Sequence, residues 1–321
     1  MLFRRNHVTN RALFQRMIRL LFICLITITL YPSAGHTSPS NSAQTLRIYT
    51  AIAPLAFIIE QIGGSHLSVE TLLTRGQDPH LFEPGPRLLH GLSKADMYLM
   101  SGLPFERILI KKITTSHKKL IIIDMTKQIS FWESDHYLDA HDCFDNHTDA
   151  HDHAQRDPHF WLGVQQLHQF ITAAAHSIRD ADPTHAATYH HNTARLLARL
   201  NSVHASNRTL LRPYRNRMFF AYHPAFGYFA RTYGLRQQTV EINGRQPGPR
   251  SIAALIKQAR AADVRTIFVQ PQYDTKGAQA IATAINGTVV PLDPLAKDVI
   301  QNLGTMAGRI AHSFMPEPPQ P

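Results

Sequence analysis

The fold of this chain is decided by the stretch from Pro183 to Pro213, which reads PTHAATYHHNTARLLARLNSVHASNRTLLRP. Pro183 begins a helical pattern and Pro213 ends it, and apolar residues such as Tyr189 and Leu196 recur along one side. At 1.5 Å per residue, this helix is roughly 40 Å long, about the span of a small domain. We therefore expect residues 182–212 to form one rigid helix that connects two folded units.

Both flanking segments alternate between short apolar runs and helical patterns, which implies a parallel sheet in each. We expect strands at Leu46–Ile52, Leu67–Leu73, Met97–Met100, Leu120–Ile123, Met218–Tyr222, Gln238–Ile242, Thr266–Val269 and Thr288–Leu292. The predicted fold class is α/β, with two Rossmann-like lobes, each a parallel-type sheet with flanking helices. The N-terminal lobe is expected at 44–181 and the C-terminal lobe at 213–315.

Helices are expected between these strands where apolar residues recur at helical spacing or capping residues occur. The expected helices begin at Pro54, Leu88, Val164, Ser251, Asp274 and Asp298. Gly63-Gly64 closes the first of them, and Gly287 ends the one that Asp274 caps.

The first 35 residues are typical of a secretory signal peptide. Five arginines and no acidic residue precede or flank the apolar run Leu20–Leu30, and Ser33-Ala34-Gly35 offers small residues for cleavage. An uncleaved anchor is disfavoured because the run is short for a transmembrane helix. Export through a cleaved signal would place the protein in the periplasm.

Charge and cysteine content narrow the function classes. The net charge is +10 and residues 1–35 carry five arginines, so the mature chain has 10 − 5 = +5. The sequence contains no basic stripe with interleaved aromatic residues, so it does not indicate a nucleic-acid partner. Cys24 lies in the apolar run without the small neighbours of a lipoprotein signal, and Cys143 is then the only mature cysteine, which excludes an internal disulfide.

The stretch 134–156 has almost no large aliphatic residues and is dense in His and Asp, so it predicts a mobile loop. Its histidines, candidates for weak metal sites, are His136, His141, His147, His151 and His153. They could capture zinc at lower affinity, with Cys143 as a further ligand, or the loop could be only a solvated insert. The Pro-rich tail 316–321 is expected to be disordered.

Four short phrases carry candidate metal ligands. Asp78-Pro79-His80 and Asp157-Pro158-His159 repeat one pattern, while His223 and Asp293 each follow a predicted strand and precede a proline. Ligands of α/β sheets gather at the carboxyl ends of strands, so two facing lobes would bring these loops together. Three imidazoles and one carboxylate, from His80, His159, His223 and Asp293, suit four-coordinate zinc.

Each phrase alone is more often an ordinary turn. Asp78 and Asp157 are interpreted as loop-capping residues rather than ligands. Three histidines plus water are also a catalytic zinc pattern, so a zinc-dependent hydrolase is a second possible function. The chain has neither an HExxH helix nor a nucleophile elbow, which favours a binding protein over an enzyme.

The motifs resemble those of the substrate-binding proteins of metal-specific ABC transporters (cluster A-I), and most closely the high-affinity zinc-uptake members. The matching segments are Gly76–Pro84, Leu92–Asp96, Ser101–Glu106, Asp157–Leu162, His223–Phe229, Gln270–Tyr273 and Leu292–Leu295. The similarity runs from about Leu46 to Phe314, and the His-rich loop is also typical of zinc members.

The resemblance implies a monomeric periplasmic protein that binds Zn(II) between its lobes and delivers it to an inner-membrane ABC permease with its ATPase. His223 stands where manganese-type members carry Glu, and nitrogen ligands favour zinc over manganese. In some zinc members, water takes the place of the carboxylate that corresponds to Asp293. Gln270 departs from the Glu common in the family. Some members of the family carry manganese or another metal and some act as adhesins, so the resemblance leaves these two functions open.

Overall fold

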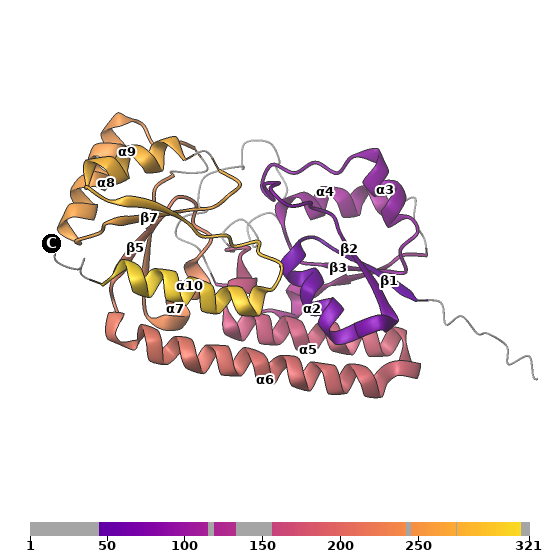
Figure 1. Ribbon diagram of the computed structural model, residues 1–321. Coiled ribbons are helices and arrows are strands. Elements are labelled where there is room, and N and C mark those ends of the chain that lie inside the picture. Colours follow the sequence, from indigo (N-terminus) through magenta and orange to yellow (C-terminus); the bar gives the residue numbers. More distant parts are fainter. Residues whose placement is uncertain (1–44, 115–118, 133–155, 242–244, 274, 316–321) are drawn as a thin grey trace, which may run out of the picture. The chain divides into compact units, whose positions relative to one another are not determined.

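The computed structural model describes residues 45–114, 119–132, 156–241, 245–273 and 275–315 (Figure 1). The predicted signal peptide, nearly all of the His-rich stretch and the C-terminal tail lie outside the described residues. None of the helices in these ranges is long and apolar enough to cross a membrane.

The first half of the chain forms a four-stranded parallel sheet. Its strands are β1 (Leu46–Thr50), β2 (Leu67–Thr71), β3 (Met97–Met100) and β4 (Ile121–Asp124), in the order β2-β1-β3-β4. Its connecting helices are α2 (Ala53–Gly63), α3 (Pro86–Leu92) and α4 (Pro104–Ile113). Parallel pairing requires a crossover between strands, which is the βαβ pattern that the alternating sequence predicted.

The second half repeats this arrangement. The strands β5 (Met218–Ala221), β6 (Arg236–Thr239), β7 (Thr266–Val269) and β8 (Thr288–Pro291) pair in parallel in the order β6-β5-β7-β8. The helices of this half are α7 (Gly227–Tyr233), α8 (Pro249–Ala261), α9 (Lys276–Ala284) and α10 (Val299–Ser313). Both sheets therefore have the same strand order.

Two helices lie between the halves in the sequence, α5 (Val164–Ala181) and α6 (Ala186–Leu211). The 26 residues of α6, extended by one 3-10 turn at each end, confirm the long helix predicted from Pro183 to Pro213. This helix packs against α2 and α5 and also against α7 and α10, so it runs along both halves (Figure 1). The α/β fold class with two parallel sheets joined by one long helix is confirmed.

The hydrophobic core crosses from one half to the other. One cluster of buried residues extends from β1 through α5 and α6 to α10, and it includes Trp161 and Tyr228. A separate cluster packs α8 and α9 against one face of the second sheet. Because α10 contacts both α6 and α2, the last helix of the chain joins the two halves. The lobe boundaries at 44–181 and 213–315 stay predictions.

Some local predictions were wrong. Strand β6 begins two residues before Gln238 and ends at Thr239, before the predicted Ile242. Past its end, the backbone N–H groups of Val240 and Glu241 both donate to Tyr222 O, which lies just after β5. Helix α8 begins after Gly248 rather than at Ser251, since a proline occupies its first turn. Asp274 lies outside the described residues.

Helix α4 was not predicted, although its capping signal is present in the sequence. Pro104 occupies the first turn, and the Glu106 carboxylate accepts hydrogen bonds from the N–H groups of Ser101 and Leu103. Tyr98 also donates its hydroxyl to this fully buried carboxylate. Burial raises the pKa of Glu106, and these donors oppose the rise.

Candidate metal centre

The structure brings three of the predicted ligands together. One potential ligand atom from each of His80, His159 and His223 lies within 4.8 Å of the others. The ring centroids are 5.5 Å apart for His80–His159, 4.9 Å for His80–His223 and 5.2 Å for His159–His223. Among the described residues this is the only group of three or more His, Cys, Asp or Glu side chains with such geometry.

Each histidine reaches the site from a loop. His80 follows β2 and His223 follows β5, both at the carboxyl end of a parallel strand, as predicted. His159 instead comes directly before a 3-10 turn, Phe160–Leu162, that leads into α5. The site therefore takes two candidate ligands from the first half of the chain and one from the second.

His159 is held by the aspartate of its own phrase. The Asp157 Oδ1 atom accepts hydrogen bonds from the backbone N of His159 at 2.9 Å and from its Nδ1 at 2.8 Å. Burial, and then repulsion from His223, keep the pKa of His159 well below its ordinary value. The ring is therefore neutral at physiological pH, and Nε2 carries the lone pair that a metal requires.

Hydrogen bonds hold the ring, the backbone N and the carbonyl oxygen of His223. Its Nδ1 lies 2.7 Å from Glu241 Oε1, and its backbone N donates to Gln270 Oε1 at 3.1 Å. The Gln270 amide donates to the His223 carbonyl oxygen at 2.9 Å. His223 Nε2 is buried and has no hydrogen-bond partner among the described residues. A buried polar atom without a partner is costly, and a metal ion would satisfy it.

His80 is positioned by a turn that also touches the second half. Asp78 Oδ1 accepts the backbone N–H of His80 at 2.8 Å, which confirms Asp78 as a loop-capping residue. The same carboxylate acts on the nearby Tyr273 hydroxyl, and the Tyr273 ring stacks on His223 at 4.9 Å between centroids. Burial and then Asp78 raise the pKa of Tyr273, so it stays a neutral donor.

Asp293 lies outside the group of converging ligand atoms. Its Oδ1 accepts hydrogen bonds from the backbone N of Leu295 at 2.9 Å and from Gln272 Nε2 at 3.3 Å. Its role as a fourth ligand stays a proposal. His136, His141, His147, His151 and His153 lie outside the described residues.

Glu241 and Tyr273 are contacts of the site that the sequence did not identify. Glu241 falls inside a predicted strand, and Tyr273 belongs to one of the matching segments without a predicted role. No local spacing relates either residue to a histidine phrase, because Glu241 is 18 residues from its partner. A buried carboxylate behind a ligating imidazole is nevertheless the usual surrounding of a metal site.

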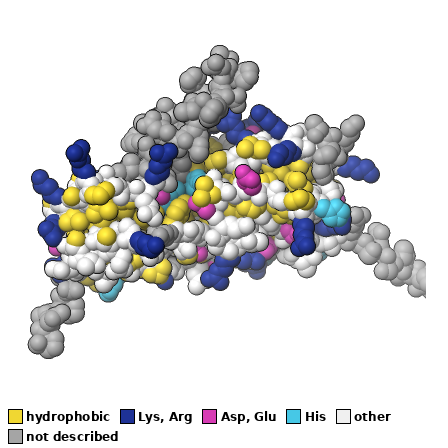
Figure 2. Space-filling model, turned by 90° about the horizontal axis from the view of Figure 1, so that it is seen from above, with side chains coloured by type: hydrophobic (Ala, Val, Ile, Leu, Met, Phe, Trp, Pro, Cys, Tyr) yellow, Lys and Arg dark blue, Asp and Glu magenta, His cyan; other side chains and the backbone are white. Residues whose placement is uncertain are grey.

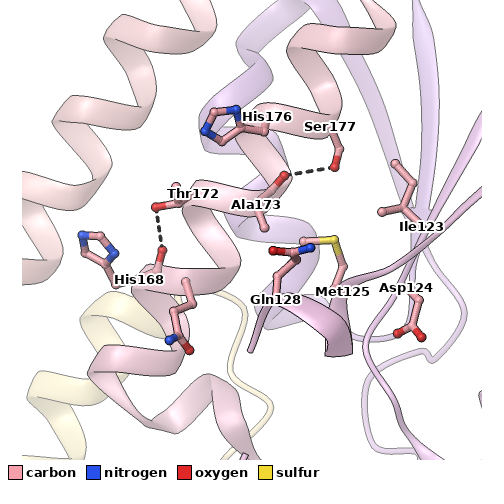
Figure 3. A pocket seen from close by; sticks show the side chains of 10 residues that line it. Ile123, Asp124, Met125, Gln128, His168, Thr172, Ala173, His176 and Ser177 are labelled. Atoms are coloured by element: carbon pink, nitrogen blue, oxygen red, sulfur yellow. Dashed lines mark hydrogen bonds between the residues drawn. The ribbon is translucent and has the colours of Figure 1, made fainter. Parts of the chain in front are cut away.

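A surface groove elsewhere also contains histidines but does not form a metal site. His168 and His176 on α5 line it together with Asp124, Met125 and Gln128 (Figure 3). The two histidines are eight residues apart, roughly 12 Å along the helix, which is too far to share an ion. The hydroxyls of Thr172 and Ser177 donate to carbonyls of their own helix.

The surface above the two halves shows histidine and acidic side chains together near its centre, while Lys and Arg lie around them (Figure 2). His80 is half-buried, whereas His159 and His223 are 3% and 6% exposed. The group is therefore almost closed to solvent, with His80 as its most accessible member. Three converging imidazoles, two of them backed by carboxylates, lie between two α/β halves and are suited to hold a metal ion, which defines a candidate metal-binding protein.

Comparison with known proteins identifies the family. The family described as zinc-uptake complex component A, periplasmic, matches residues 48–308. The high-affinity zinc uptake system protein ZnuA of Yersinia pestis is 26% identical over 277 residues, which are 82% of this chain and 87% of that protein. A putative metal-binding protein of Chlamydia muridarum is 25% identical over 295 residues, 92% of this chain and 99% of that protein.

Solved structures agree with this match. A zinc-bound deletion mutant of ZnuA has a TM-score of 0.76 and 31% sequence identity, covering 85% of this chain and 100% of that one. The chain belongs to the periplasmic zinc-uptake component A family. It is a cluster A-I metal-binding component of an ABC transporter, periplasmic or extracellular, and not an enzyme, which excludes the zinc-dependent hydrolase.

Proposed function

We propose that the protein captures Zn(II) at His80, His159 and His223 and delivers it to an inner-membrane ABC permease driven by its ATPase. The observation that supports this most directly is the convergence of three imidazoles around a buried His223 Nε2 that has no partner among the described residues. The fourth position of a tetrahedral zinc would be taken by Asp293 or by water.

The donor set supports zinc over manganese. Borderline metals such as zinc prefer imidazole nitrogen, whereas manganese prefers oxygen ligands. No carboxylate joins the converging group in the part of the chain that the structure describes, since Asp157 and Glu241 bind the Nδ1 atoms of the histidines instead. We propose a monomer that works in the periplasm, with lobes at 44–181 and 213–315 joined by 182–212.

The test is a competitive zinc and manganese titration of the metal-stripped mature protein beside a His223→Glu variant. We expect one tight zinc site in the wild type, with zinc preferred strongly over manganese. The variant should lose zinc affinity and gain in relative manganese affinity, because an oxygen ligand replaces a nitrogen ligand. Absence of a tight zinc site would refute the proposal that the protein captures zinc. An unchanged preference for zinc over manganese in the variant would show that His223 does not set the metal selectivity.

The His-rich stretch is proposed to hold weaker zinc sites at His136, His141, His147, His151 and His153. Replacing residues 134–155 by a short Gly-Ser linker should keep the tight site and abolish the weak ones. The linker can close because Asp157 N donates to Trp132 O at 3.2 Å, so the ends of the segment are adjacent.

The matched control for this deletion changes the five histidines to serine and keeps the chain length. Both variants should show the same zinc stoichiometry by equilibrium dialysis, one ion per chain. If either variant loses the tight site, the division between a tight cleft site and weak loop sites is wrong. If the weak sites survive in both, their ligands lie elsewhere.

A further inference from the structure

Glu241 is the buried carboxylate that directly contacts the His223 ring. It follows β6, is 6% exposed, and places Oε1 at 2.7 Å from His223 Nδ1. The carboxylate can only accept a hydrogen bond, so Nδ1 carries the proton and donates it. The other ring nitrogen, Nε2, then presents its lone pair to the site where His80 and His159 converge.

The contacts of His223 divide into two kinds. Gln270 binds only the backbone of His223, through its N and its carbonyl oxygen. Tyr273 stacks on one face of the ring at an interplanar angle of 19°. Neither contact selects which ring nitrogen is protonated. The tautomer, and with it the ring nitrogen that presents a lone pair to the site, therefore depends on Glu241.

We infer that Glu241 is the positioning residue of the metal site: it fixes the His223 tautomer and its negative charge stabilises a bound dication. The inference rests on the proposed function of His223 as a ligand. Imidazoles that ligate a metal bring no charge of their own, whereas the carboxylates of Asp157 behind His159 and Glu241 behind His223 supply negative charge. These balance the charge of a divalent ion in a buried place.

Two variants distinguish the effect of His223 ring orientation on zinc affinity from the effect of the Glu241 charge. Glu241→Gln keeps a carbonyl oxygen that can accept the Nδ1 proton but removes the charge, while Glu241→Ala removes both. Loss of an outer carboxylate behind a ligating histidine weakens metal binding by roughly 10- to 100-fold. We expect Glu241→Ala to show that loss and Glu241→Gln a smaller one. Asp180→Asn, an exposed carboxylate on α5, is the charge-matched control and should leave affinity unchanged.

The experiment combines zinc titration with nitrogen NMR of histidine in the metal-free proteins. In the wild type, His223 should show a protonated Nδ1 and a free Nε2. That pattern should persist in Glu241→Gln and change to a mixture of tautomers in Glu241→Ala. Thermal unfolding of each metal-free variant checks that the fold is retained.

The outcomes distinguish this inference from the proposed function. If the wild type shows no tight zinc site, the proposed function fails, although the NMR measurement still tests the tautomer. If the wild type binds zinc tightly and Glu241→Ala binds it equally well, Glu241 has no positioning role. A weaker Glu241→Ala variant with the wild-type tautomer would overturn Glu241 as a positioning residue, because the loss of affinity would then come from its charge alone.

Discussion

Replacing His80 by Ala is expected to weaken zinc binding by roughly two to three orders of magnitude. Structural zinc sites bind with about 10–16 kcal/mol, so each of four ligands accounts for roughly 2.5–4 kcal/mol, or two to three orders of magnitude. His80 is the cleanest ligand to remove, because it is half-buried and the Asp78 turn binds its backbone N–H, which alanine retains. Removing His159 or His223 would in addition leave the buried carboxylates of Asp157 and Glu241 without their imidazoles.

Competitive zinc titration measures this loss, and the zinc-dependent rise in melting temperature gives a second readout. Zinc that binds only the folded protein raises the melting temperature by more the tighter it binds, so the rise should shrink in the variant. His190→Ala, an exposed position on α6, is the matched control and should behave as the wild type. An unchanged zinc affinity for His80→Ala would show that His80 is not a ligand.

Replacing Trp161 by Ala is expected to lower the free energy of unfolding by about 3–5 kcal/mol, the usual cost of removing a large buried aromatic side chain. Trp161 is 0% exposed, and its Nε1 donates to the Pro294 carbonyl oxygen at 2.8 Å. The substitution therefore leaves both a cavity and a carbonyl without its donor. Because this bond joins the segment after His159 to the one after Asp293, zinc affinity should fall as well.

Urea unfolding of the metal-free protein measures the stability change. The other tryptophan provides the matched control, since Trp132 is half-buried and stacks on Tyr228 with centroids 4.6 Å apart. Trp132→Ala should cost clearly less, because part of its surface already faces solvent. If the two variants lost equal free energy of unfolding, the burial and the hydrogen bond of Trp161 would not make it more important for stability than Trp132.

The regular elements were predictable because their signals are local. The prolines at 183 and 213 predicted the ends of the long helix to within a few residues, and the strands Met97–Met100 and Thr266–Val269 were predicted correctly. A parallel strand buried on both faces is a continuous apolar run, which can be recognised in a single sequence. Strand β6 was misplaced because its sequence, RQQT, is polar and gives no such signal.

The three histidines were predictable for a different reason. His80 and His159 are each preceded by an aspartate and a proline, and His223 follows an apolar strand. These local phrases mark loops at the ends of strands, where α/β proteins bind ligands. Asp293 has the same kind of phrase, and its Oδ1 accepts hydrogen bonds from Leu295 N and Gln272 Nε2, while its role as a ligand stays a prediction. A phrase of this kind therefore marks a loop, and only the packing of the loop decides where its side chain points.

By itself, the sequence determined the α/β class, the long helix and which three histidines converge. Helix ends, buried strands and turns depend on neighbouring residues, so their signals are local. Only the tertiary structure decided which groups surround those histidines. Glu241 reaches His223 from the segment after β6, and Gln270 and Tyr273 reach it from the segment after β7. The Asp78 carboxylate of the other half acts in turn on Tyr273. Contacts between segments distant in sequence follow from the packing of the sheets and of α10, which no local pattern records.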